Sequence, residues 1–358
     1  MIRLLHRPRM AAALFVVTTL VSSMPLAAQP IADPSSDASA VVADVPASLR
    51  ESFAYGGKFA FIRSADGTRL RYGQWSARGA QRGTIVLLGG RGEFIEKYAG
   101  ELVGELTGRG FAVAALDWRG QGLSERKLAD HDKGHVGDFA EYRDDLGAFL
   151  GQIVLPQAGA GPVIALAHSM GGHTVLRLLA EKPEIAKFDA AILAAPMTGL
   201  TNELPIRLAL LFAPAGSRRD SDYMLGFGKF GETRLSFEQN RVTHDPRRYR
   251  YTDLWYQADP RLRVGGPTYG WLRAGLRSNA LLRQDGYFKS VTVPILLLSA
   301  GQDQLVDSAT HRRICAALTG CRLVRLPASK HEIMMETDPN RAIFWAEFDR
   351  FVAALAAR

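Results

Sequence analysis

The segment Ala167-His-Ser-Met-Gly-Gly172 joins two stretches of different hydrophobic pattern. Pro162–Ala167 is a short apolar run typical of a buried strand, whereas Gly172–Ala180 has the periodicity of a helix. A serine at a strand-to-helix junction is typical of a nucleophile elbow, a turn so tight that the positions two residues before and after it must be small. Alanine and glycine hold those positions here. Ser169 is therefore a candidate nucleophile; the alternative is a buried strand that ends in a serine helix cap.

A serine nucleophile needs a general base, and the base needs a group that orients it. The apolar run Val293–Ala300 leads into a loop with Asp303, and the run Cys321–Leu326 leads into a loop with His331. Taken singly, the aspartate could cap a helix and the histidine could be a solvated loop residue. Together with Ser169 they have the chain order Ser, Asp, His, which is that of α/β-hydrolases. This combination predicts a catalytic triad.

Two neighbours of these residues have competing interpretations. Asp307 lies four residues after Asp303, at the start of an expected helix, where an acid stabilises the helix N-terminus. It is the alternative triad acid. His173 lies one turn after Ser169, and we interpret it as a packed helix residue rather than a second base.

The run Thr84–Leu88 is a further expected strand, followed by a glycine-rich loop. In an oxyanion hole one N–H comes from the residue after the nucleophile, here Met170, and the other from a loop after an earlier strand, here Arg91. A glycine-rich loop after a strand also suits a phosphate. However, the loop lacks both Gly-Lys-Ser/Thr and G-x-G-x-x-G, so nucleotide binding is disfavoured.

In this combination the chain resembles the α/β-hydrolase branch of bacterial lysophospholipases and monoacylglycerol lipases. The resemblance rests on Ala167–Gly172 together with Leu88–Glu93, Asp117–Ser124, Gly134–Phe139, Gly301–Asp303 and Lys330–Glu332. It covers roughly residues 58–355, and Asn240–Tyr249 resembles the lysophospholipase side of the branch. Gly89 stands where this family usually has histidine, so any role of that histidine is absent or replaced here.

The resemblance implies a serine hydrolase that cleaves carboxylic esters through an acyl-enzyme, without cofactor or metal. The expected substrate is a lysophospholipid or a monoacylglycerol. Because a fold does not determine a substrate, two alternatives stay open. One is a carboxylesterase, amidase or peptidase that acts on a small non-lipid molecule. The other is a non-catalytic binding protein on the same fold.

The remaining hydrophobic runs predict a doubly wound, mostly parallel sheet with helices on both faces. The expected strands are 58–63, 68–75, 84–88, 112–116, 162–167, 190–195, 293–299 and 322–326, with Asp66-Gly67 as the turn of an antiparallel lead-in hairpin. From about 200 to 287 the alternation lapses for too long to be a loop. We therefore expect an α/β-hydrolase domain over 53–358, with an inserted helical cap that contributes to an acyl pocket over Ser169.

The first residues have the pattern of a secretory signal: Met1–Arg9 is basic, and Met10–Val21 is apolar. We predict a signal peptide over 1–28 and a flexible linker over 29–52, and hence a periplasmic or secreted protein. An uncleaved inner-membrane anchor is the alternative. The formal net charge is +8, with the basic residues spread along the chain. This distribution disfavours nucleic-acid binding and is compatible with weak attraction to an anionic membrane surface.

Cys315 and Cys321 are the two cysteines of the chain. Cys315 lies near the end of an expected helix, Thr319-Gly320 turns the chain, and Cys321 opens the last strand. Such a reversal can bring the two Cα atoms within disulfide range, and an oxidising compartment would preserve the bond. Two reduced, buried cysteines are the alternative. With His168 and His173 they make no zinc pattern, so no metal is expected.

Overall fold

The computed structural model describes residues 56–159 and 161–356. The predicted signal peptide and linker lie outside these residues. The described chain forms one eight-stranded sheet with the order β1-β2-β4-β3-β5-β6-β7-β8. Its strands are β1 (Lys58–Arg63), β2 (Arg69–Trp75), β3 (Gly83–Leu88), β4 (Phe111–Leu116), β5 (Val163–His168), β6 (Ala190–Ala194), β7 (Ile295–Ala300) and β8 (Cys321–Leu326). The pairs β1–β2 and β2–β4 are antiparallel, and every other pair is parallel.

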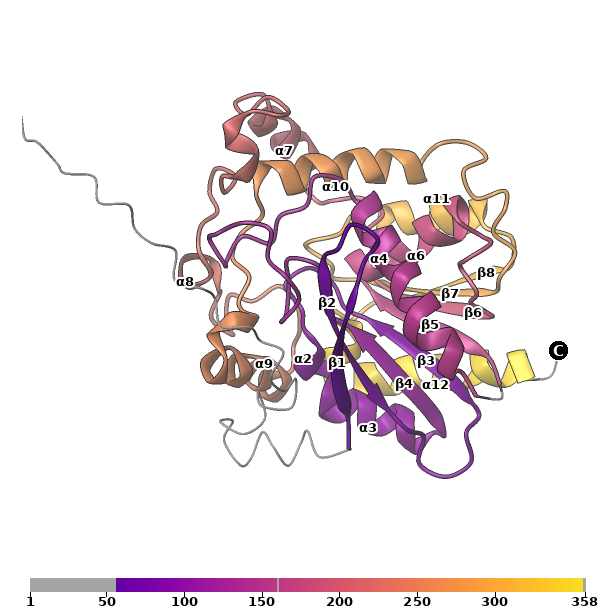
Figure 1. Ribbon diagram of the computed structural model, residues 1–358. Coiled ribbons are helices and arrows are strands. Elements are labelled where there is room, and N and C mark those ends of the chain that lie inside the picture. Colours follow the sequence, from indigo (N-terminus) through magenta and orange to yellow (C-terminus); the bar gives the residue numbers. More distant parts are fainter. Residues whose placement is uncertain (1–55, 160, 357–358) are drawn as a thin grey trace, which may run out of the picture. The chain divides into compact units, whose positions relative to one another are not determined.

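The central strands are apolar throughout because both faces of the sheet are covered. In β3, Val86 and Leu88 pack into one hydrophobic core, while Ile85 and Leu87 pack into the other. Side chains of a strand alternate between faces, so one apolar run supplies both cores. Figure 1 shows the helices arranged on the two sides of the sheet.

The helices divide between these two cores. Three helices pack into the first core: α4 (Ala140–Phe149), α6 (Met170–Glu181) and α11 (Ala309–Ala317). A short π-helix (Leu150–Val154) and then α5 (Leu155–Gln157) continue from the end of α4. Three other helices pack into the second core: α2 (Ile95–Ala99), α3 (Glu101–Gly108) and α12 (Asp338–Ala356). No helix of the described residues is both long and apolar enough to cross a membrane.

Between β6 and β7, where the sequence predicts a cap, the chain forms a set of helices: α7 (Glu203–Leu210), α8 (Phe230–Thr233), α9 (Pro246–Ala258) and α10 (Tyr269–Leu282), with 3-10 turns at Arg218–Ser221 and Pro260–Leu262. The start of α9 is capped by Asp245, whose side chain accepts from two backbone N–H groups, and Pro246 occupies the first helical position. Trp255 of α9 packs into the second core, and Trp271 of α10 packs into the first. The insertion therefore contacts both cores.

Cys315 and Cys321 form a disulfide, with their Cα atoms 5.3 Å apart. The bond joins α11 to the first residue of β8. The strand β8 separates this bond from the loop that carries His331. A further 3-10 turn, Ile333–Met335, links that loop to α12.

Candidate active site

Ser169 lies between the last residue of β5 and the first residue of α6, with a backbone φ of 49°. This left-handed conformation is unfavourable for a residue with a side chain and persists only where the surroundings enforce it. The Ser169 N–H donates to the Ala194 carbonyl, and the Ser169 carbonyl accepts from the N–H groups of His173 and Met197. A Cβ on Gly171 would lie 2.6 Å from the Gly89 carbonyl oxygen. The turn therefore has the geometry of a nucleophile elbow.

Asp303 and His331, which follow β7 and β8, are directly hydrogen-bonded. His331 Nδ1 lies 2.7 Å from Asp303 Oδ2, and both residues are largely buried. The other carboxylate oxygen accepts the N–H groups of Leu305 and Val306. Burial raises the pKa of Asp303, but the His331 imidazole and these two N–H groups outweigh it, so the pKa lies below its ordinary value. The ionised carboxylate holds a proton on Nδ1, which leaves Nε2 free to accept one.

The loop of His331 meets the turn of Ser169 through His168. The His168 and His331 rings lie 4.7 Å apart between centroids, and His168 Nε2 is 3.2 Å from the His331 carbonyl oxygen. Ser169 Oγ itself has no hydrogen-bond partner among the described residues. Catalytic hydrogen bonds are often loose before substrate binds and tighten in the complex.

Asp307, the alternative acid, serves α11 instead. Its Oδ1 accepts the N–H of Ala309 at the start of that helix. Its own N–H donates to the Gly199 carbonyl. Of the two candidate acids, Asp303 is therefore the one that is hydrogen-bonded to His331.

The glycine-rich loop lies against the nucleophile, since a Cβ on Gly90 would be 3.1 Å from Ser169 Cβ. In this loop the N–H of Gly90 donates to Glu93 and the N–H of Gly92 donates to Gln121. The intervening Arg91 N–H has no acceptor among the described residues. Met170 is the first residue of α6, a position whose N–H has no partner within the helix. Both predicted oxyanion donors are therefore unengaged.

Sequence reasoning missed the role of Glu93, a fully buried carboxylate that organises this loop. It accepts from Lys97 Nζ at 2.6 Å, from the Tyr98 hydroxyl at 2.6 Å, from His168 Nδ1 at 3.0 Å and from the Gly90 N–H. Burial raises the pKa of Glu93, but the charges of Lys97 and His168 outweigh it and hold the pKa well below its ordinary value. The sequence feature that could have indicated this role is the position of Glu93, an acid that directly follows the glycine-rich loop.

Lys97 extends this network to the other side of the site, because its Nζ also lies 2.7 Å from a Glu332 carboxylate oxygen. Glu332 is the residue after His331. The buried ammonium of Lys97 thus joins the glycine-rich loop, which carries the predicted oxyanion donor Arg91, to the loop of the predicted base. It holds both loops in position.

His173 is a packing residue, as the sequence indicates. Its Nδ1 lies 2.8 Å from the Met197 carbonyl oxygen, and its Nε2 lies 2.5 Å from the Ser278 hydroxyl. Burial lowers the pKa of His173 to about 3. The neutral ring therefore ties α6 to α10.

The segment Asn240–Tyr249 fastens the His331 loop from outside. The Glu332 N–H donates to the Val242 carbonyl, and Lys330 Nζ donates to the Asn240 carbonyl at 3.0 Å. Glu336, with a fully buried side chain, accepts from the Lys330 N–H and from His244 Nδ1, each at 2.8 Å. The segment that resembles the lysophospholipase side of the branch therefore holds the loop of the predicted base.

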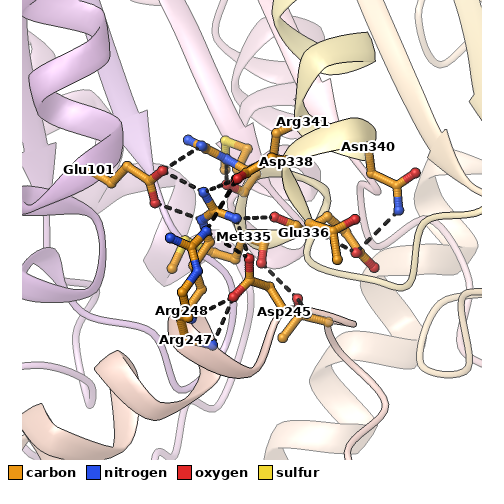
Figure 2. A network of polar contacts seen from close by, with 12 residues as sticks. Glu101, Asp245, Arg247, Arg248, Met335, Glu336, Asp338, Asn340 and Arg341 are labelled. Carbon is orange, nitrogen blue, oxygen red and sulfur yellow. Dashed lines mark hydrogen bonds and ion pairs between the residues drawn. The ribbon is translucent and has the colours of Figure 1, made fainter.

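Arg248 is the centre of the same attachment (Figure 2). Its guanidinium donates to Asp245 and Asp338, to the Glu336 carbonyl at 2.7 Å and to Glu101 of α3 at 2.6 Å. The start of α9 is thereby joined to the sheet-covering helices and to the segment that follows His331.

A cavity of about 270 Å³ lies beside the oxyanion loop, between the core and the insertion. Its lining includes Arg91 and Gly92 of the loop, Glu332 of the His331 loop, and aromatic residues of the insertion, namely Phe227, Phe230, Tyr249 and Tyr256. Within residues 56–159 and 161–356, no three His, Cys, Asp or Glu side chains are grouped so that they could hold a metal ion.

Comparison with known proteins agrees with this geometry. The model of the serine aminopeptidase S33 family matches residues 79–338. Lysophospholipase L2 of Escherichia coli strain K12 is 37% identical over 289 residues, which cover 78% of this chain and 82% of that protein. Monoglyceride lipase of Homo sapiens is 28% identical over 252 residues, which cover 68% of this chain and 73% of that protein.

The fold is also found among solved structures. A soluble variant of monoglyceride lipase from Saccharomyces cerevisiae, in complex with a substrate analog, superposes with a TM-score of 0.66 at 20% identity. The superposition covers 83% of this chain and 94% of that one. The chain therefore belongs to the serine aminopeptidase S33 family of α/β-hydrolases and is a serine hydrolase related to lysophospholipases and monoglyceride lipases.

Proposed function

We propose that this protein cleaves the acyl ester of a lysophospholipid or a monoacylglycerol, with Ser169, His331 and Asp303 as its catalytic triad. Ser169 Oγ attacks the ester carbonyl while His331 Nε2 accepts its proton. The N–H groups of Arg91 and Met170 stabilise the oxyanion. His331 then protonates the leaving alcohol, and water, activated by the same histidine, hydrolyses the acyl-enzyme.

The observation that carries this proposal is the strained turn of Ser169 beside the Asp303–His331 hydrogen bond. A backbone in this conformation has no structural advantage by itself, and such strain is typical of functional sites. The names of the relatives, lysophospholipase L2 and monoglyceride lipase, support a lipid ester as substrate.

A substrate panel tests the reaction class. We expect the protein to hydrolyse a lysophospholipid and a monoacylglycerol with a higher kcat/KM than a short p-nitrophenyl ester, because a long acyl chain buries more apolar surface in the cap. A fluorophosphonate probe should label Ser169. Turnover confined to short esters or to an aminoacyl amide would indicate a small-molecule esterase or a peptidase. Absence of both labelling and turnover would indicate a binding protein.

We also propose that the insertion contacts a lipid surface. Large apolar side chains are exposed on α7 and the loops that follow it: Leu204, Leu208, Leu211, Phe212 and Leu225, with Leu211 and Leu225 exposed by 74% and 75%. Such a group of exposed apolar residues is typical of an interaction site. Arg218 and Arg219 belong to the same segment and would attract anionic headgroups, whereas Arg207 is paired with Glu203.

Vesicle binding tests this contact. Replacing Leu211 and Phe212 together by serine should lower binding to phosphatidylglycerol-containing vesicles by about tenfold or more, since two large side chains no longer enter the bilayer surface. Co-sedimentation measures the change. Ile343→Ser is the matched control, because Ile343 is 45% exposed but belongs to α12. Equal binding of both variants and the unaltered protein would contradict the proposal.

We further propose that the protein is exported to the periplasm or secreted. The basic and apolar pattern of residues 1–28 supports export. The Cys315–Cys321 disulfide supports an oxidising compartment, where such bonds persist.

A further inference from the structure

Arg91 extends from the oxyanion loop into the space beneath the insertion. Its Nη2 donates to the Gly265 carbonyl at 2.9 Å, and its guanidinium carbon lies 5.0 Å from the centre of the Trp271 ring. The Nε–H is buried and has no acceptor. Of the five N–H donors of this guanidinium, only one, on Nη2, therefore has a hydrogen-bond partner among the described residues.

This guanidinium also lacks a counter-ion. No carboxylate of the described residues lies within 4.0 Å of it, whereas the largely buried Arg119 and Arg248 each meet several carboxylates. Burial lowers the pKa of Arg91 to about 10, and only tyrosine hydroxyls, those of Tyr142, Tyr223 and Tyr256, oppose the shift. Arg91 is partly buried, and its Nε–H is shielded from water, so the site favours an anion that the protein does not itself supply.

The other charged groups that line the same cavity are already paired. Lys97 bridges Glu93 and Glu332, and Arg234 is bound to Asp253. The Glu93 carboxylate also accepts hydrogen bonds from the Tyr98 hydroxyl and the Gly90 N–H. Among the charged side chains of this cavity, Arg91 thus remains the one whose charge is not matched.

We propose that the Arg91 side chain binds the phosphate of a lysophospholipid headgroup, and so favours lysophospholipids over uncharged monoacylglycerols. This inference rests on the proposed function, in which the Arg91 N–H binds the oxyanion. The length of the Arg91 side chain matches the distance along a 1-acyl lysophospholipid from its ester to its phosphate. The guanidinium carbon lies as many bonds from its own backbone nitrogen as the phosphorus lies from the ester carbonyl carbon. One residue can therefore hold both the reacting carbonyl and the headgroup, and a guanidinium matches phosphate geometry.

The test compares two substrates with the same acyl chain, lysophosphatidylethanolamine and a monoacylglycerol. Arg91→Met is expected to lower the ratio of their kcat/KM values, phospholipid over glyceride, by about tenfold to a hundredfold. Arg91→Lys should retain part of the ratio, because it keeps the charge but loses the fork of donors. The ratio is the readout, since both rates also depend on the oxyanion loop.

Arg126→Met is the matched control. Arg126 is also a partly buried arginine whose pKa is lowered to about 10, mainly by burial and in small part by the charge of Arg91, and it also joins the core to the insertion, through the Arg261 and Arg263 carbonyls. It does not line the cavity. We expect its replacement to leave the ratio unchanged. We expect Arg126→Met to lower the kcat/KM values for both substrates by the same factor. If Arg91→Met and Arg91→Lys do the same, Arg91 only attaches the insertion to the core and the inference is wrong.

Inhibition of the unaltered protein gives a second readout that does not depend on a variant folding. Glycerophosphoethanolamine, the deacylated headgroup, should inhibit hydrolysis of a short p-nitrophenyl ester at least tenfold more strongly than glycerol does. Equal inhibition by the two compounds would overturn the inference. If the unaltered protein hydrolyses neither lipid, the proposed function fails instead, and the two failures are distinguishable.

Discussion

Ser169→Ala is expected to lower turnover by about a million-fold while leaving the fold intact. The hydroxyl is the attacking group in the proposed mechanism, and it makes no hydrogen bond on which the described structure depends. Adding His331→Ala should then cost little more, because a general base has no task without the nucleophile. Turnover of the single and double variants, with circular dichroism to monitor folding, makes the comparison.

A double variant far less active than either single variant would contradict this assignment, since it would mean that the two residues act independently. The control is His173→Gln, a histidine of the same helix that is hydrogen-bonded to the Met197 carbonyl and to Ser278. It should affect the free energy of unfolding more than the chemical step.

Asp303→Asn is expected to lower kcat by about ten thousand-fold, whereas Asp307→Asn should change mainly the free energy of unfolding. The asparagine can present its amide nitrogen to His331 Nδ1, which favours the wrong tautomer. Asp307 instead accepts the N–H of Ala309 at the start of α11, and losing such a hydrogen bond costs about 1 kcal/mol. Parallel kinetics and thermal unfolding of the two variants separate the effects. The reverse pattern would make Asp307 the triad acid.

Replacing Asp303 should change the pH dependence of the free energy of unfolding in a defined direction, which denaturant unfolding at several pH values measures. The pKa of Asp303 lies below its ordinary value, so the hydrogen bonds that its carboxylate accepts from His331, Leu305 and Val306 contribute to stability above the unfolded-state pKa. That contribution is lost as the pH falls through the folded-state pKa. Asp303→Asn should therefore weaken the fall in stability toward acidic pH.

Much of the fold was predictable because parallel, doubly covered strands are continuous apolar runs. Each of the eight expected strands matches an observed strand to within two residues. The largest offset is at the start of β7, which begins at Ile295 rather than 293. Pro294 has no N–H to donate to a ladder, although its carbonyl still accepts from Ala191.

The site was predictable only where its chemistry lies in short local motifs. The Ser169 turn and the Asp303 and His331 loops are motifs of this kind. The network of Glu93 was not, because Lys97, His168 and Glu332 come from three separate segments, and only folding brings them together. The counter-ion that Arg91 lacks was equally invisible, since it depends on which side chains are near in space.

The attachment centred on Arg248 bears on how the protein could be re-engineered or could diversify. Because α9 is part of the insertion yet holds the segment after His331, the insertion is not a detachable module. A cap grafted from a relative would lack the partners of Lys330 and Glu336, and the loop of the predicted base, His331, would no longer be held in place. A successful chimera would need to exchange Asn240–Tyr249 together with Lys330–Arg341, because these two distant stretches form one structural unit.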